Sequence, residues 1–392
     1  MPETETRGLK VLLHLLFFLS GITTVLIGQV LPILARHFEL NDLQVSYFFP
    51  AQFAGSLAGT FFTSRFARRN NYFTAAFIGS MLMAAGIMLM NVDTFAGCLF
   101  GFLINGLGIG MTLPSINMLI LEMSHARAAS ALSVLNFCWG VGAIICKPFV
   151  DAFATQSSMG ITTYVLAVPL TISAAGLFLL GQKGRQTTVE HLDEAIDRAP
   201  IWTMPLAWMI ALFNFIHVGF ESGIGGWLTT YTGRVSGAPL APWISPTLLY
   251  FSFFVLGRGF APLLFRFLNE NRMLMLGLLT VLGGMVVILS ASSVVELSLG
   301  ATLAGFGTSW IFPTNVSRFS HTFGPTASRR ATPLFICGTL GAASSTWLIG
   351  LISERTGNLH SGMYVLVVAV AILIVLQIVL SRRTTVAVLQ VE

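Results

Sequence analysis

Charged side chains are scarce in this sequence. Asp, Glu, Lys and Arg together make up 9% of the 392 residues, whereas soluble domains carry roughly 25%. So low a charge content excludes an ordinary water-soluble domain. Hydrophobic residues make up 55% of the chain, and apolar stretches recur from Val11 to Leu380. Since a helix of about 20 such residues crosses the hydrocarbon core of a bilayer, the composition predicts an all-α membrane protein whose surroundings are lipid.

Motifs typical of enzyme sites are also missing. The chain has no GxxxxGK[ST] phosphate loop, no HExxH metal helix and no GxSxG nucleophile elbow, which argues against ATP-driven transport and against catalysis. Its four cysteines lie in apolar stretches without CxxC spacing, so we interpret them as packing residues. We therefore expect no enzyme activity, no cofactor and no metal. The net charge is +5. We interpret the distribution of the basic residues along the chain as a sign of membrane topology, so no nucleic-acid partner is expected.

Hydrophobic stretches bounded by polar residues or by Gly and Pro predict twelve spanning helices. The run that follows the polar segment Met1–Lys10 has no small-residue cleavage site, so we interpret it as the first span and not as a signal peptide. The predicted spans are 10–36, 42–67, 71–90, 94–123, 127–152, 159–181, 202–232, 240–267, 271–291, 294–319, 327–353 and 358–381.

Basic residues then indicate the orientation. With a cytoplasmic N-terminus, most of the 21 Lys and Arg residues fall on inner segments, as the positive-inside rule requires. We therefore expect both termini in the cytoplasm of a bacterium, with the protein in the inner membrane. The longest polar stretch is interpreted as a cytoplasmic linker, 182–201, between an N-terminal six-helix bundle, 1–181, and a C-terminal six-helix bundle, 202–392.

The two halves share a motif. A GxG precedes a proline by six positions in GLGIGMTLPSIN, 106–117, and again in GFGTSWIFPTN, 305–315. Arg65 and Arg266, which follow the second and eighth spans, repeat at a similar offset of about 200 residues. We infer a parallel duplication of one unit. This organisation resembles the major facilitator transporters, in which two six-helix halves bind substrate between them near the middle of the membrane.

A loop signature strengthens this resemblance. The segment GTFFTSRFARRN, 59–70, is similar to the major facilitator signature GxxxDRxGRR. Its arginines are present as Arg65, Arg68 and Arg69, whereas Ser64 and Ala67 replace the Asp and the Gly. The resemblance implies a gating role for the three arginines at the inner side, without the carboxylate that usually holds this gate shut.

The predicted span 202–232 resembles one branch of that superfamily. Its segment FNFIHVGFESGIGGWLTTYTGR is similar to the corresponding helix of the fucose permease branch, the fucose, galactose and glucose proton symporters. The segments NFCWGVGAIICKP, 136–148, and GLISERTGN, 350–358, resemble the same branch. The resemblance implies sugar transport coupled to protons. The acidic residues that the branch carries in its first and fourth spans are absent at those depths, where this sequence has Thr23, Thr24 and Gln29 in the first span and Met111, Ser115 and Asn117 in the fourth. The acid of the fourth span, Glu122, lies near its cytoplasmic end.

Ionisable side chains inside a membrane cost about 2.5 to 3.5 kcal/mol on insertion scales, so each is expected to have a partner or a task. Asn214, His217 and Glu221 are spaced i, i+3 and i+7 and share one face of the predicted helix. They form the leading candidate site, in which Glu221 and His217 carry the transported proton; sodium is the other coupling ion considered. The alternative is that they pair with each other or with a basic group and only hold the structure together.

Amides, hydroxyls and indole rings at similar depth are further candidates for substrate contact, because they bind sugar hydroxyls or stack on the apolar face of a pyranose. Bonding between helices explains any one of them equally well, and an aromatic belt at the outer interface explains the tryptophan at position 227. These candidates are Asn136, Trp139, Thr24, Gln29, Asn117 and Trp227.

Gating residues are predicted from charge pairs. Lys147 and Asp151 lie one turn apart toward an outer end, where an intrahelical ion pair serves an outer gate or attracts anions. Arg258 lies in the inner half of a span and needs a counter-charge, for which Glu122 and Glu221 are the candidates. A salt bridge at a gate is favoured over direct contact of Arg258 with substrate.

These observations together predict a monomeric secondary transporter. It moves a small molecule, a sugar or a related polyhydroxylated solute, by alternating access with protons. The first alternative is an exporter of amphipathic drugs, lipids or organic anions on the same fold, which the 15 Met and 32 Phe residues would suit. The second, from another class, is a transport-inactive membrane sensor or scaffold.

Overall fold

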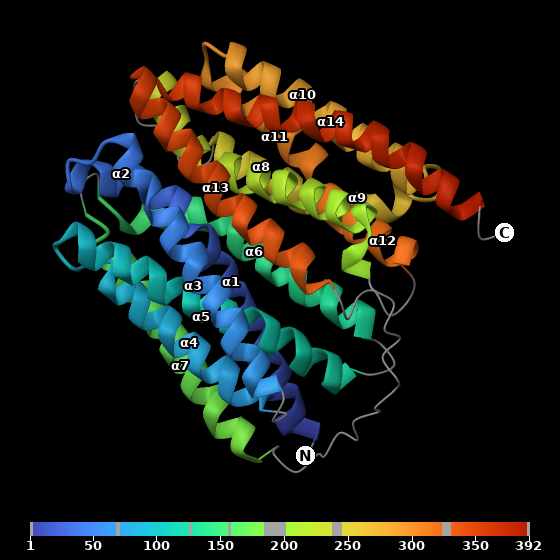
Figure 1. Cartoon of the computed structure of the whole chain (residues 1–392). Coiled ribbons are helices and arrows are strands. Elements are labelled where there is room, and N and C mark those ends of the chain that lie inside the picture. The colour runs from blue at the N-terminus through green and yellow to red at the C-terminus, as the bar shows by residue number, and fades with distance from the viewer. Residues whose placement is uncertain are drawn as a thin grey trace. The chain divides into compact units, whose positions relative to one another are not determined.

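The computed structural model describes residues 3–67, 71–124, 128–155, 158–183, 201–236, 245–323 and 331–389. Within these ranges the regular structure is helical, without a strand. The chain divides into two compact units, Met1–Glu190 and His191–Glu392, whose helices are labelled in Figure 1. The predicted linker 182–201 falls almost entirely on residues outside the described ranges, so its boundaries stay a prediction.

The first unit contains seven described helices. The longest, α1, continues without a break although it contains Pro32. The bounds are α1 Glu3–His37, α2 Asp42–Ser46, α3 Phe48–Ala67, α4 Tyr72–Leu89, α5 Phe95–Ser124, α6 Ala128–Phe153 and α7 Ile161–Lys183.

The second unit contains a short 3-10 helix and seven α-helices in its described part. Its first long helix, α8, carries the polar residues of the leading candidate site. The bounds are η2 Ile201–Thr203, α8 Pro205–Ser236, α9 Pro246–Leu264, α10 Glu270–Ser290, α11 Val294–Thr308, α12 Ile311–Phe323, α13 Thr332–Thr356 and α14 Leu359–Leu389.

The helices account for the twelve predicted spans. Eleven described segments are long and apolar enough to cross a membrane, with α11 and α12 forming one segment, Val294–Phe323. The remaining predicted span is the 20-residue helix α3. One boundary differs from the prediction, because the stretch 42–67 is divided into α2 and α3. A capping box between Asn41 and Gln44 begins α2, and this local cap starts a separate short helix before the span.

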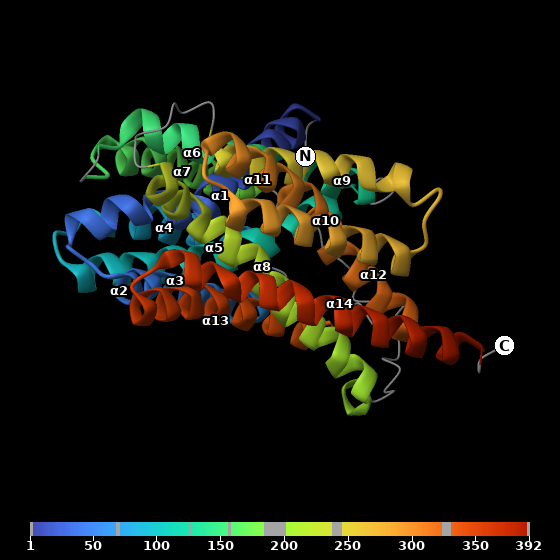
Figure 2. The same ribbon diagram turned by 90° about the horizontal axis from the view of Figure 1, so that it is seen from above.

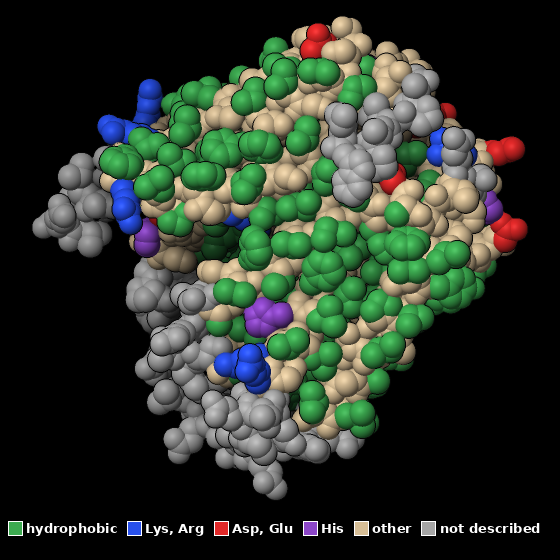
Figure 3. Space-filling model, turned by 180° about the vertical axis from the view of Figure 1, so that it is seen from behind, with side chains coloured by type: hydrophobic (Ala, Val, Ile, Leu, Met, Phe, Trp, Pro, Cys, Tyr) green, Lys and Arg blue, Asp and Glu red, His purple; other side chains and the backbone are tan. Residues whose placement is uncertain are grey.

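The outer surface of the bundles is apolar, as expected for helices in lipid. On the face shown in Figure 3, hydrophobic side chains are widespread and charged side chains are few. Large apolar residues such as Ile172, Leu179, Phe267 and Val295 are exposed. In water a surface of this kind would drive aggregation, whereas in a bilayer it faces acyl chains at no cost.

Helix pairing repeats between the units. In the first unit α1 packs on α6, and α5 packs on α3 and α4. In the second unit α8 packs on α13, and α11 packs on α9 and α10; the helices of both units are seen from another side in Figure 2. Because each pair lies within one unit and joins elements at the same places of the two halves, this supports the inferred duplication.

Glycines at matching positions allow these close approaches. A Cβ on Gly106 would lie 1.9 Å from the carbonyl oxygen of Gln52, and a Cβ on Gly305 would lie 2.2 Å from that of Tyr250. Both distances are far below van der Waals contact and both obstacles are backbone. The GxG motifs of the sequence are therefore packing sites between α5 and α3 and between α11 and α9.

The substitution Gly305→Ala is expected to destabilise the protein. The added methyl must push α11 and α9 apart, and such overpacking costs roughly 1–3 kcal/mol. Gly283→Ala in α10 is the matched control, since nothing lies within 4 Å of its added Cβ and alanine favours the helix by about 1 kcal/mol. Thermal unfolding in detergent should show a lower Tm for Gly305→Ala only, and equal Tm values for both variants would contradict the packing role.

Candidate functional site

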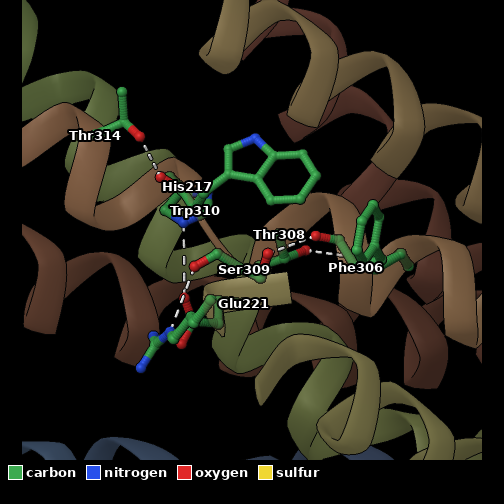
Figure 4. A network of polar contacts seen from close by, with 9 residues as sticks. His217, Glu221, Phe306, Thr308, Ser309, Trp310 and Thr314 are labelled. Carbon is green, nitrogen blue, oxygen red and sulfur yellow. Dashed lines mark hydrogen bonds and ion pairs between the residues drawn. The ribbon is translucent and has the colours of Figure 1, made fainter. Parts of the chain in front are cut away.

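Helix α8 presents the three polar residues predicted from the sequence on one face. Asn214 and His217 are buried, with side-chain exposures of 0% and 1%, and Glu221 is partly exposed. The Nε2 atom of His217 lies 3.6 Å from Oε2 of Glu221, and both residues are drawn in Figure 4. This pair at i, i+4 is an ion pair when the imidazole is protonated and otherwise leaves a neutral base beside a carboxylate.

The imidazole of His217 has no hydrogen bond to the described residues at either ring nitrogen. Buried polar groups nearly always have partners, because an unsatisfied one costs free energy. Asn214 differs, since its Nδ2 donates to the carbonyl oxygen of Leu334 on α13 at 2.9 Å. Asn214 therefore ties α8 to α13, whereas His217 retains capacity to accept or donate a proton.

Arg258 on α9 is a cation that faces this pair. Its guanidinium interacts electrostatically with Glu221 and with Tyr250, and its Cζ lies 4.2 Å from the centroid of the Phe254 ring. Its Nε donates to the carbonyl oxygen of Ser309 at 3.3 Å. We call His217, Glu221, Tyr250 and Arg258 the α8–α9 cluster. Glu221, one of the two counter-charges that the sequence suggested, lies within electrostatic range of Arg258, but the two side chains form no ion pair in this conformation.

The segment between α11 and α12 forms the neighbouring wall. Helix α11 ends at Thr308 and α12 begins at Ile311, so Ser309 and Trp310 lie at a break within one predicted span. The indole Nε1 of Trp310 donates to the carbonyl oxygen of Met273 at 3.0 Å, and the Ser309 Oγ donates to that of Phe306 at 2.6 Å. These bonds hold the break in one conformation, and its residues are drawn in Figure 4.

Sequence reasoning did not find Tyr250, Ser309 or Trp310. Tyr250 is fully buried and interacts electrostatically with Glu221. The available signal was the SW-x-x-P pattern at 309–313. Ser309 and Trp310 have modest helix propensity, and Pro313 lacks the N–H that a continuous helix would need. That signal indicates a helix break but not which side chains lie against it.

Candidates in the first unit make mostly local bonds. Asn136 donates to the carbonyl oxygen of Leu132 at 2.8 Å, Asn117 to that of Leu113 at 2.9 Å, and the hydroxyl of Thr24 to that of Ser20 at 2.7 Å. Each of these acceptors lies on the same helix as its donor. Such bonds satisfy the side chain without fixing it to another helix, so the role of all three in substrate contact stays a prediction.

Three further candidates are less accessible. Gln29 is buried with 3% exposure, and Trp227 is fully buried. The indole of Trp227 donates to the carbonyl oxygen of Thr346 on α13 at 3.0 Å, so in this conformation it packs α8 on α13. The Nε1 atom of Trp139 on α6 is buried and has no hydrogen-bond partner among the described residues, which leaves it able to donate to a solute.

The structure describes only some of the predicted gating residues. Lys147 and Asp151 form the ion pair that their spacing allows. The guanidinium of Arg65 lies 5.7 Å from the ring centroid of Phe61, and the residue is exposed. Arg68, Arg69 and the side chain of Glu122 lie outside the described part of the structure, so their gating roles stay predictions.

A second buried polar cluster was not predicted. Arg318 on α12 is 3% exposed, and its Nη1 donates to Oε1 of Gln377 on α14 at 2.7 Å. Its Nη2 bonds Oδ1 of Asn315, and its Cζ lies 4.8 Å from the ring centroid of Phe213 on α8. This cluster joins α8, α12 and α14 and is independent of the α8–α9 cluster.

Comparisons with known proteins identify the family. The model of the Major Facilitator Superfamily matches residues 13–332. The chain is 24% identical to the 4-hydroxybenzoate transporter PcaK of Pseudomonas putida over 61% of this chain and 58% of that protein. It is 22% identical to the glucose/mannose transporter GlcP of Bacillus subtilis over 96% of each chain. The chain spans between 49% and 58% of the length of the curated relatives that it matches first.

Solved structures agree with the fold. The transporter FucP in the outward conformation superposes with a TM-score of 0.62 at 17% identity, over 95% of this chain and 98% of that one. An identity this low supports the architecture and carries no information about the cargo. Twelve predicted spans, a duplicated helix pairing and a family match over most of the chain lead to one conclusion: the chain belongs to the Major Facilitator Superfamily.

Proposed function

We propose that the chain is a proton-coupled secondary transporter that moves a sugar or a related polyhydroxylated solute by alternating access. The observation that carries the coupling is the α8–α9 cluster. A buried imidazole without hydrogen bonds to the described residues lies 3.6 Å from the Glu221 carboxylate, and Arg258 interacts with the same carboxylate. In a site of this kind the carboxylate can be ionised or protonated, and only the ionised form is strongly attracted to the nearby cation Arg258.

Protonation changes the charge balance of this cluster. With Glu221 ionised and His217 neutral, the carboxylate and Arg258 cancel. With Glu221 protonated, Arg258 is left as an uncompensated cation, and electrostatic attraction inside a membrane is much stronger than in water. Binding and release of one proton therefore favour different arrangements of α8 and α9, which is the requirement for coupling a proton to a conformational change.

The sugar assignment is supported by a relative and by donor chemistry. GlcP, whose name states glucose and mannose transport, aligns along nearly its whole length. Among the described residues, the buried amide oxygen of Asn214 and the indole N–H of Trp139 have no hydrogen-bond partner. An amide acceptor and an indole donor are groups that bind sugar hydroxyls. We propose these two together with Asn136, Thr24, Gln29 and Asn117 as substrate contacts.

An organic anion is the second candidate cargo. The observation in its favour is Arg258, which is only partly buried and lies over the Phe254 ring, a setting suited to a carboxylate attached to an apolar body. Three PcaK proteins, named as 4-hydroxybenzoate transporters, are among the relatives. Such an anion enters with a proton if Glu221 is the coupling group, so the two cargos share one mechanism.

The proposal is tested by uptake into proteoliposomes containing the purified full-length protein. An inward proton gradient should drive accumulation of at least one compound from a panel of hexoses, pentoses and aromatic carboxylates, and a protonophore should abolish it. A matched sodium gradient tests the other coupling ion. Binding without flux for every compound would favour a sensor or scaffold, and loss of preloaded amphipathic dye would favour an exporter; either result contradicts the proposal.

The cellular setting is part of the proposal. We propose a monomer in the bacterial inner membrane with both termini in the cytoplasm, supported by the distribution of Lys and Arg along the twelve spans. The gating roles of Arg65, Arg68, Arg69 and Glu122 at the inner side and of Lys147 and Asp151 at the outer side belong to the same proposal. Labelling of single cysteines introduced at the two ends in intact cells measures this orientation.

A further inference from the structure

Prolines occupy matching places in the two units. Pro114 lies inside α5, and Pro313 lies in the first turn of α12. A proline has no backbone N–H, so the carbonyl four residues earlier loses its helical partner. In the first unit this carbonyl belongs to Gly110, and in the second unit it belongs to Ser309.

The two carbonyls are satisfied by different chemistry. In the first unit, the hydroxyls of Thr60 and Thr63 on α3 lie 3.4 and 3.3 Å from the Gly110 carbonyl oxygen, as donors that each hydroxyl shares with a carbonyl of its own helix at 3.0 Å. In the second unit, Nε of Arg258 on α9 donates to the Ser309 carbonyl oxygen at 3.3 Å. A neutral hydroxyl therefore fills the position in one unit and a cation fills it in the other.

Thr60 and Arg258 are equivalent positions of the repeat. Their separation in the sequence matches that of Gly110 and Ser309, about 200 residues in each case. The close approach of Gly106 to Gln52 and of Gly305 to Tyr250 gives the same alignment of α3 with α9. The difference in chemistry thus arises at one position of a shared framework.

The bond to Ser309 leaves part of the guanidinium free. Arg258 bonds the Ser309 carbonyl oxygen through Nε, and its two terminal nitrogens make no hydrogen bond to the described residues. The Cζ atom of the guanidinium lies 4.2 Å from the centroid of the Phe254 ring. The planar fork of an arginine binds a carboxylate through two parallel hydrogen bonds. With Nε occupied and one face covered, the fork can turn only within a narrow range.

We propose that the Ser309 carbonyl, freed by Pro313, positions Arg258 as the fixed counter-charge of Glu221. Arg258 is then held by the backbone of the α11–α12 break, independently of the protonation state of Glu221. The effect of this positioning on transport rests on the proposed coupling function. The positioning itself is measured on the purified protein without a transport assay. The counterpart in the first unit supplies no charge, so the proposal assigns this role to the second unit alone.

The substitution Pro313→Ala tests the positioning. The new alanine supplies an N–H that competes for the Ser309 carbonyl, so Arg258 should lose its bond and become more reactive. The initial rate of phenylglyoxal modification at Arg258, measured by peptide mass spectrometry on the purified protein, should rise about tenfold, the effect of losing one hydrogen bond to a charged group. Pro114→Ala is the matched control and should leave the rate at Arg258 unchanged. An unchanged rate in Pro313→Ala, or an equal rise in both variants, would overturn the proposal.

A second pair of variants keeps the proposal testable if Pro313→Ala fails to fold. Arg258→Thr and Arg258→Leu remove the same charge, but only threonine reproduces the hydroxyl of the first unit, so Arg258→Thr should keep a higher Tm than Arg258→Leu, which leaves the carbonyl unsatisfied. Equal Tm values for these variants would show that the carbonyl needs no donor. Arg258→Thr should also lose proton-driven uptake; if it transports normally while the modification result holds, the positioning stands and the coupling function fails.

Discussion

The variant Glu221→Gln is expected to lose proton-driven accumulation while it retains counterflow of the same solute. Glutamine keeps the size of the side chain and its hydrogen-bonding oxygen, but it carries neither the negative charge nor the exchangeable proton. Counterflow needs only binding and the reorientation of the loaded carrier, so its rate should stay within about twofold of the parent protein. The measurement is uptake into proteoliposomes, first with an inward proton gradient and then with preloaded unlabelled solute.

Glu354→Gln provides the matched control for this result. Glu354 is an exposed carboxylate near the end of α13, so its neutralisation should change neither assay. Equal loss of accumulation and counterflow in Glu221→Gln would reassign Glu221 to substrate binding or to structure. Retention of both would remove Glu221 from the mechanism, and the 3.6 Å approach of His217 would then be a packing contact.

The variant Arg318→Ala is expected to show the largest loss of stability among substitutions in the second unit. Arg318 is almost completely buried and bonds the side-chain oxygens of Gln377 and Asn315. Its removal leaves two buried acceptors without a donor and a cavity beside Phe213, which together cost about 3 kcal/mol or more. Thermal unfolding in detergent should therefore show a Tm lower by about 5 °C or more.

Arg266→Ala is the control for the loss of a cation in the same unit. Arg266 is exposed, and surface substitutions usually change stability by less than about 0.5 kcal/mol. A fall in Tm limited to Arg318→Ala supports a structural cluster that joins α8, α12 and α14. If Arg318→Ala were as stable as Arg266→Ala, the buried guanidinium would contribute nothing net, a result known for some buried ion pairs.

Much of the architecture was predictable because it depends on local composition. Hydropathy located the spans since each helix must satisfy its own backbone groups in lipid. The repeated GxG and proline indicated the duplication, and the helix pairs of the two units agree with it. The division of 42–67 into α2 and α3 was missed, because a capping box of a few residues is weak beside an apolar stretch of twenty.

The candidate site was predictable only along one helix. The spacing of Asn214, His217 and Glu221 places them on one face of α8, as observed. Trp227 follows on the same helix, yet an apolar ring near a helix end is typical of an interfacial residue and of a buried one alike. Its bond to the Thr346 carbonyl decides for burial in this conformation, and no periodicity contains that bond.

Composition and periodicity alone determined that this chain is a duplicated helical membrane protein and that one face of its seventh predicted span is polar. These properties depend on residues close together in the sequence and on the low polarity of lipid. Only the tertiary structure decided which polar groups lie near one another: Tyr250 and Arg258 on α9 are within electrostatic range of Glu221, and the carbonyl left free by Pro313 accepts a hydrogen bond from Arg258. Such contacts join segments tens of residues apart, and they are set by how closely glycine-lined helices pack and not by the identity of the polar residues themselves.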